Sequence, residues 1–270
     1  LFYGDNLDIL RSGKIKEDSI DLCYIDPPFN SKRNYNQIYN NIGHEDRAQA
    51  QAFIDTWTYD DFAVSGYEEI RENAHGRFTN QLVSLVVGLK SVLGNGSLLA
   101  YLISMSLRIT EIQRALKSNG SFFLHCDPTS SHYLKLVLDS VFCPTGGQFQ
   151  NEIVWCYETG GRSKSYFPRK HDIIFWYSKS LKGRFIYDQV ALERDFSTMH
   201  ETVHTDSDGR QYQTNFKNGK LYQYYKSKGV LPNDWWLDIQ ALNPAAKERM
   251  GYPTQKPEAL LERIIKSTTT

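Results

Sequence analysis

The sequence lacks the features that mark several protein classes. Its 270 residues contain no apolar run long enough to cross a membrane, and the first residues show no signal-peptide pattern. Only four cysteines occur, widely spaced and without a C-x-x-C pair, which argues against a zinc site or a disulfide framework. Internal repeats and low-complexity tracts are also missing. We therefore expect a cytoplasmic protein without a membrane partner, built on one core or on one core plus a subdomain.

The sequence also has no net charge, with 31 basic and 31 acidic residues. The charges are unevenly distributed, because residues 1–150 carry 13 Lys and Arg against 17 Asp and Glu, whereas residues 157–251 carry 15 against 11. Aromatic side chains cluster among the cations of the second stretch. This pattern indicates contact with an anion such as nucleic acid, although a mixed solvated surface gives a similar pattern.

Hydrophobic periodicity predicts alternating strands and helices. Helices are expected at 7–11, 63–95, 98–117, 128–142 and 259–266, and strands at 22–25, 121–124, 151–157 and 173–177. Asn119-Gly120 is expected to stop the third helix, and residues 30–62 are expected to form a long loop. The alternation of strands and helices implies an α/β fold with a parallel sheet and helices on both faces.

The most informative stretch is the apolar run 22–25 and the turn that follows it. Pro27 and Pro28 cannot donate to a sheet ladder, so the predicted strand must end before them. Asp26 is therefore expected at the carboxyl edge of a sheet, where open α/β sheets bind ligands, with Phe29 just beyond a stiff turn. Acceptor oxygens beside a flat ring suit a planar base that bears an amino group. A simple turn with an exposed acid is the alternative.

Asp26-Pro27-Pro28-Phe29 resembles the catalytic D-P-P-[YF] motif of amino-group DNA methyltransferases, which methylate the exocyclic nitrogen of adenine or cytosine with S-adenosylmethionine. Residues 3–10, 116–127 and 252–257 resemble further motifs, in the order of the circularly permuted beta class. The resemblance implies an α/β, Rossmann-like S-adenosylmethionine-dependent methyltransferase fold, circularly permuted, with an inserted target-recognition region.

The resemblance also implies a division of the chain. Residues 1–150 would be the catalytic methyltransferase core, 151–251 the DNA target-recognition region, and 252–270 the return to the core at the start of the cofactor-binding half. The beta class continues into an F-x-G-x-G cofactor loop, which this sequence does not contain, so we expect a truncated chain. Residues 94–96 read Gly-Asn-Gly, but helical patterns flank them and predict a helix–helix turn.

In this family the motif acid and the following carbonyl, here Asp26 and Pro27, accept the two N–H bonds of the target amine. Pro28 stiffens the turn, and the aromatic Phe29 stacks on a base that has been flipped out of the duplex. The D-P-P form favours the N6 atom of adenine as the target. Cytosine N4 methylation remains an alternative, as does a DNA-binding specificity protein without catalysis.

Two segments are expected to hold the S-adenosylmethionine cofactor. By resemblance, Asp5 and Asn6 lie near its adenosine, and Thr254, Gln255, Lys256 and Pro257 lie beside its methionine end. The second assignment has a physical basis, because a carboxylate suits a helix N-terminus with a cation nearby.

Double-stranded DNA is the expected partner, and a restriction subunit or a second copy of the chain could join it. Candidate DNA contacts are Asn30, Lys164, Arg169, Lys170 and His171, because cations dominate contacts with phosphate. No metal is expected. The stretch 125–127 reads His-Cys-Asp, but neighbours on a strand point to opposite faces and share one ion poorly, and its acid is better suited to cap the next helix.

Overall fold

A computed structural model describes residues 2, 4–28, 33–36, 51–55, 57–158, 163–196, 202–243, 245–251 and 254–270. Its α-helices are α1 (Asn6–Arg11), α2 (Asp61–Glu72), α3 (Asn80–Leu93), α4 (Ser97–Ala115), α5 (Ser131–Phe142), α6 (Tyr187–Val190) and α7 (Glu258–Thr268). Its strands are β1 (Ile20–Ile25), β2 (Arg33–Asn36), β3 (Gln51–Asp55), β4 (Leu116–Cys126), β5 (Gln148–Cys156), β6 (His171–Ser178), β7 (His204–Thr205), β8 (Gln211–Lys217), β9 (Lys220–Tyr225) and β10 (Trp235–Trp236). Two short 3-10 helices are Cys143–Thr145 and Lys226–Lys228.

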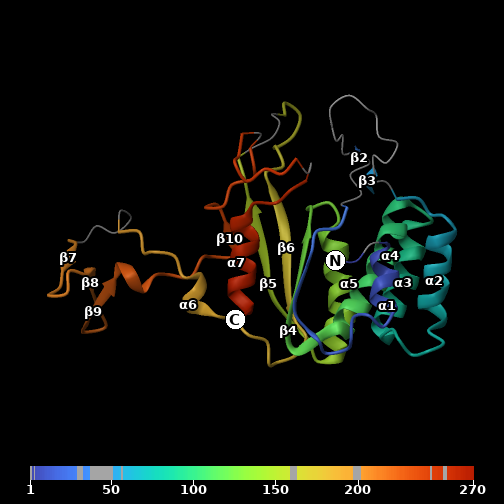
Figure 1. Ribbon diagram of the computed structural model, residues 1–270, viewed down its shortest axis with the longest axis horizontal. Helices are drawn as coiled ribbons and strands as arrows, with labels where there is room; N and C mark the ends of the chain where they lie inside the picture. Colours follow the sequence, from blue (N-terminus) through green and yellow to red (C-terminus); the bar gives the residue numbers. More distant parts are fainter. Residues whose placement is uncertain are drawn as a thin grey trace.

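A five-stranded sheet in the order β1-β4-β6-β5-β10 forms the centre of the molecule (Figure 1). The predicted α/β class is confirmed, but the prediction of a purely parallel sheet is wrong at β6. β1 runs parallel to β4 and β10 runs parallel to β5, whereas β6 is antiparallel to both of its neighbours. The described residues between β5 and β6 contain no helix, whereas parallel neighbours are usually joined by a crossover helix.

This topology gathers several chain segments at one edge of the sheet. Asp26 follows β1, Asp127 follows β4, Tyr157 follows β5, and Lys170 precedes β6. We call this edge, defined by these four residues, the Asp26 edge. It lies at the top of the sheet in Figure 1, close to the chain that enters α7.

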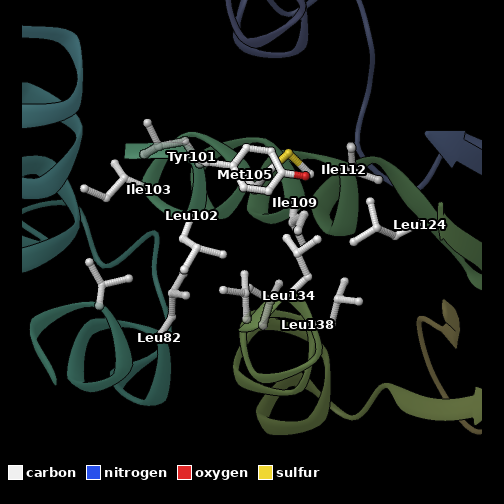
Figure 2. Packing of buried hydrophobic residues seen from close by; sticks show 14 of the residues in the cluster. Leu82, Tyr101, Leu102, Ile103, Met105, Ile109, Ile112, Leu124, Leu134 and Leu138 are labelled. Carbon is white, nitrogen blue, oxygen red and sulfur yellow. The ribbon is translucent and has the colours of Figure 1, made fainter. Parts of the chain in front are cut away.

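Helices cover both faces of the sheet, as predicted. α4 and α5 pack on one face, where Leu124 of β4 meets Leu134 and Leu138 of α5, and Leu82 joins them from α3 (Figure 2). α7 covers the other face through Leu260 and Ile264, which pack among aromatic side chains of the sheet. Each fully buried leucine or isoleucine stabilises the fold by about 1.5–3 kcal/mol, so both layers hold the sheet rigidly.

The structure shifts two predicted boundaries. α4 ends at Ala115, and not at Asn119-Gly120, because the chain from Leu116 onward pairs with β1. A Cβ atom at Gly120 would lie 2.9 Å from the carbonyl oxygen of Ile20, so glycine is required there by close approach and not by a helix stop. The predicted turn at 94–96 is confirmed, since α3 and α4 flank it.

Asp127 caps the turn that leads into α5, and its carboxylate accepts from the backbone N–H of Ser130 at 3.2 Å. The helix itself begins at Ser131, three residues after the predicted start at 128. Within the predicted loop at 30–62, β2 and β3 pair as an antiparallel ribbon, so the expectation of a loop throughout is wrong. No helix among the described residues has the length and apolar character needed to cross a bilayer.

A second sheet, β7-β8-β9, projects to one side of the central sheet (Figure 1). We call this antiparallel sheet the arm. An antiparallel bridge between Leu192 and Val230 joins the two segments that lead to and from the arm. The predicted boundary at 150/151 falls inside β5, because β5, β6 and β10 all belong to the central sheet. Only part of 151–251 is therefore separate from the core.

Candidate active site

The Asp26 edge brings together two segments that lie 230 residues apart in sequence. Lys256 donates from Nζ to Oδ2 of Asp26 at 2.7 Å. Its side chain is only 13% exposed, so the pair is largely shielded from solvent. Backbone geometry explains the placement, because Pro27 ends β1 at this edge and Pro257 is the N-cap of α7 above it. The sequence predicted both segments as functional, and the structure joins them through one ion pair.

A chain of partly buried hydrogen bonds lies beneath Asp26. The hydroxyl of Tyr24 contacts Nδ1 of His125 at 2.7 Å, and Nε2 of His125 contacts Oδ2 of Asp172 at 3.0 Å. Tyr157 donates to the other oxygen of Asp172 at 3.1 Å. Three of these side chains come from β1, β4 and β6, and Tyr157 directly follows β5, so the bonds join four of the five strands of the sheet. We call these four side chains the edge network.

The geometry orients the donors in this network. A carboxylate only accepts, so Nε2 of His125 donates to Asp172, and the hydroxyl of Tyr24 is the partner of Nδ1. Burial raises the pKa of Tyr24 far above its usual value, and the charges of Asp26 and Asp172 add to the shift. Burial also raises the pKa of Tyr157, again with Asp172 nearby. Both phenols therefore remain protonated donors, which keeps the network in one arrangement.

The segment before α7 is fixed by its own side chains. Gln255 accepts from the backbone N–H of Met250 at 2.7 Å and donates to the carbonyl of Glu248 at 2.8 Å. The carboxylate of Glu248 accepts from the backbone N–H of Glu258 at 3.0 Å, at the first turn of α7. Gln255 thus holds the loop, and the N-terminus of α7 does bind a carboxylate, that of Glu248. Thr254 is half-buried beside them.

The other predicted cofactor residues lie against α4. Arg108 donates to both oxygens of Asp5, at 2.9 and 3.0 Å, and to Oδ1 of Asn6 at 2.6 Å. Asp5 also caps α1 by accepting from the backbone N–H of Leu7 at 2.7 Å. A carboxylate has about four acceptor positions, of which these contacts use three. Asp5 is half exposed, so a further donor could still reach it.

The predicted DNA contacts fall partly within the described residues. Lys164 and Arg169 are exposed in the connection between β5 and β6, and His171 begins β6. Lys170 bends back to donate to the carbonyl of Glu158 at 3.1 Å. Phe29 and Asn30, predicted for base stacking and DNA contact, lie outside the described residues. Among the residues that are described, no group of three or more His, Cys, Asp or Glu could hold a metal ion.

Sequence reasoning missed three residues that support the site. Tyr157 was assigned only to the predicted strand 151–157, Arg108 only to the predicted helix 98–117, and Asp172 lay just before the predicted strand 173–177. The signal that could have revealed Asp172 is its position, since an acid directly precedes the apolar run of β6 at the sheet edge. Nothing in the sequence pairs Arg108 with Asp5, because 103 residues separate them.

The fold and the site define an α/β protein whose sheet edge presents an Asp-Pro-Pro turn beside a lysine, as expected for amino-group methyltransferases. Residues 20–270 match the DNA methylase family N6_N4_Mtase, and the chain belongs to this family.

Two curated relatives illustrate the range of the family. The chain is 27% identical over 169 residues to the type II methyltransferase M.BglII of Bacillus subtilis, covering 60% of this chain and 42% of that one. It is 23% identical over 267 residues to the DNA adenine methyltransferase YhdJ of Escherichia coli K12, covering 98% of this chain and 65% of that one. Among solved structures, the cytosine-N4-specific PvuII DNA methyltransferase aligns with a TM-score of 0.46 and 13% identity, over 100% of this chain and 70% of that one. The chain thus spans under two thirds of both curated relatives.

Proposed function

We propose that the protein that contains this chain is an S-adenosylmethionine-dependent DNA methyltransferase that acts on the N6 amino group of adenine. The observation that carries the proposal is the Asp26–Lys256 pair, which joins the acidic turn after β1 to the segment before α7. These are the two segments that the family uses for the target amine and for the methionine end of the cofactor. Family membership across residues 20–270 supports the same reaction class.

The chemistry needs fixed acceptors, because the lone pair of an exocyclic amine is delocalised into the ring of the base. In our proposal Asp26 and the carbonyl of Pro27 accept the two N–H bonds and turn the lone pair toward the incoming methyl group. They also stabilise the positive charge that develops on nitrogen, an effect of about 3 kcal/mol for one fixed group. The edge network supports Asp26 from below by locking Tyr24, two residues away on the same strand.

The residues around Lys256 fit the methionine end of S-adenosylmethionine, which supplies the methyl group as a sulfonium. Lys256 would bind the carboxylate of the cofactor, and the N-terminus of α7, which holds the Glu248 carboxylate, suits an anion. Gln255 and Pro257 would position Lys256 without touching the ligand, and Thr254 would line the approach. Toward the adenosine, Asp5 keeps an open acceptor position although Arg108 holds it and Asn6.

Adenine is favoured over cytosine on two grounds. The motif acid is Asp26, whereas cytosine N4 enzymes of the family mostly carry serine there. The similarity to a relative named as a DNA adenine methyltransferase extends over 98% of the chain. Cytosine N4 methylation is the second candidate function.

The arm and the connection between β5 and β6 are our candidates for DNA contact within the predicted region 151–251. The β8–β9 hairpin exposes Phe216 and Leu221 beside Lys217 and Lys220, which join aromatic or apolar surface to positive charge. Arginine and lysine would bind phosphates, and the exposed rings would contact bases or sugars. A restriction subunit or a second copy of the chain stays a prediction for the whole protein.

Product analysis tests this proposal. The complete protein that carries this chain is incubated with plasmid DNA and S-adenosylmethionine bearing a labelled methyl group, and the DNA is then digested to nucleosides. We expect the label in N6-methyldeoxyadenosine, identified by chromatography and mass spectrometry. Label in N4-methyldeoxycytidine would support the second candidate function, cytosine N4 methylation. Label in neither nucleoside would contradict methyl transfer to DNA.

A further inference from the structure

The connection between β5 and β6 combines positive charge with exposed aromatic rings. Its described part, residues 163–170, reads Ser-Lys-Ser-Tyr-Phe-Pro-Arg-Lys and contains three cations and no acid. Phe167 is 97% exposed, and Tyr166 beside it is 68% exposed. A single exposed aromatic residue is ordinary on a protein surface. Phe167 lies between Lys164 and Arg169 in sequence, on a loop that leaves the sheet at the Asp26 edge. An exposed aromatic ring flanked by cations suits a partner that carries negative charge and stacked aromatic bases.

The base of this loop is fixed to the site. Tyr157 donates from its backbone N–H to the carbonyl of Lys170 at 3.0 Å, which closes the two ends of the connection. Asp172, two residues further, reaches Tyr24 through His125, and Asp26 follows Tyr24 by two residues. The edge network therefore ties the position of the loop to that of Asp26.

Local hydrogen bonds order residues 163–166 of the loop. The hydroxyl of Ser163 accepts from the backbone N–H groups of Ser165 and Tyr166, both at 3.2 Å. Pro168 fixes the backbone directly after Phe167. A ring held away from the protein in this way loses little conformational freedom when it inserts between other rings.

We propose that Phe167 is a wedge that enters the base stack of duplex DNA beside the base flipped toward Asp26, while Lys164 and Arg169 bind the flanking phosphates. The inference rests on the proposed function, because a methyltransferase must open the duplex to reach its base. Apolar side chains that enter a base step occupy space that a base leaves and hold the duplex open. Phe167 acts as a positioning residue, since it touches neither the amine nor the methyl group.

Binding to DNA with a prepared gap in its stack tests the wedge without knowledge of the recognition sequence. The complete protein that carries this chain is titrated, with fluorescence anisotropy as the readout, against a labelled short duplex and against the same duplex with one abasic site. We expect the abasic duplex to bind at least about fivefold more tightly, the value of one stacking contact near 1 kcal/mol. Phe167→Ala should abolish this preference and leave the affinity for the intact duplex unchanged, while Phe167→Trp should keep the preference.

Three control variants separate the wedge from other effects. Lys164→Ala should weaken binding to both duplexes equally and lower the salt dependence. Leu181→Ala removes an apolar side chain that is 78% exposed just after β6, at the opposite edge, and should change neither value. Met250→Ala removes another exposed apolar side chain near Lys256 and should also keep the preference. Because Phe167 is exposed, we expect Phe167→Ala to fold like the parent.

The outcomes distinguish the two proposals. A preference for the abasic duplex that survives in Phe167→Ala, or that Met250→Ala removes instead, overturns the wedge and leaves DNA binding intact. If neither duplex binds, both the wedge and DNA as a substrate are contradicted. Binding to vesicles of anionic phospholipid in place of DNA would assign the basic aromatic loop to a membrane surface and would also overturn the proposal.

Discussion

The Asp26 edge and the arm place their aromatic and charged side chains in opposite ways. At the edge, Tyr24, His125 and Asp172 are shielded from solvent, and each side chain is bonded to the next. In the arm, Phe216 is 71% exposed and Lys217 beside it is exposed as well. Buried polar groups cost stability unless each has its partner, whereas exposed ones cost little. The function of the edge therefore depends on fixed hydrogen-bond geometry, whereas that of the arm depends on exposed side chains.

This difference matters for the proposed reaction. A transition state is stabilised only by acceptors whose positions are set before the substrate arrives, and the edge network provides such fixed positions. Contact with DNA needs mobile cations and flat rings that adapt to a duplex, and the arm provides those. Substitutions at the edge should therefore change catalysis or folding, whereas substitutions in the arm should change affinity alone.

The largest expected effect is at Asp26. In the complete protein that carries this chain, Asp26→Ala should lower the rate of methyl transfer by at least about a hundredfold, because a fixed group that stabilises developing charge contributes about 3 kcal/mol. DNA affinity should change little, since Asp26 carries no phosphate contact in the proposed mechanism. Transfer of labelled methyl groups measures the rate, and anisotropy measures the affinity.

Asp21 provides the matched control, because it lies at the opposite end of β1, the strand that Asp26 follows, and pairs with Lys117. Asp21→Ala should retain full activity. A rate within a few-fold of the parent for Asp26→Ala would remove the catalytic assignment and, with it, the contrast between the edge and the arm.

The second effect concerns folding. His125→Ala removes the fully buried partner that the partly buried Asp172 and Tyr24 share, which should lower the free energy of unfolding by about 2–4 kcal/mol. Urea denaturation followed by circular dichroism measures the change. His132→Ala, an exposed histidine on α5, should have almost no effect. Equal stability of the two variants would mean that the edge network contributes no more than surface residues do.

The third effect should appear in the arm. Lys217 and Lys220 flank the tip of the β8–β9 hairpin, and both are exposed. Replacing both by alanine should reduce the slope of log affinity against log salt by about 2, since each phosphate contact contributes about 0.9. The thermal melting temperature should stay constant. Lys182→Ala, in the exposed turn after β6, should leave the salt slope as it is, and an unchanged slope in the double variant would exclude the arm from the DNA interface.

Much of the core could be predicted from sequence because its signals are local. The stripe of α4 and the apolar run before Asp26 each follow from a single stretch of chain, and the prolines mark where β1 ends. The place of β6 between β4 and β5 could not be predicted, since β4 and β6 lie far apart in sequence. The same holds for the site. Asp26 and Lys256 were predicted separately by resemblance, but their ion pair and the edge network depend on contacts across 15 to 230 residues.

The smallest expected effect compares an ion pair of the central sheet with one of the arm. Asp238 follows β10 and accepts from Arg263 of α7, with Nη1 at 3.0 Å, and this hydrogen bond lowers the pKa of Asp238 although partial burial opposes the shift. A carboxyl whose pKa is lowered on folding contributes stability above its unfolded pKa of about 3.9 and loses it as the pH falls through the folded pKa. Asp238→Asn should therefore destabilise the protein by less than about 1 kcal/mol at neutral pH, because the pair is partly exposed, and the difference from the parent should vanish in acid.

In the arm, the pKa of Asp206 is lowered mainly by the backbone N–H of Arg210 four residues away, a contact that joins no two elements of the core. We expect Asp206→Asn to leave the main melting transition unchanged at every pH, and a shift as large as that of Asp238→Asn would show that the arm and the central sheet unfold as one unit.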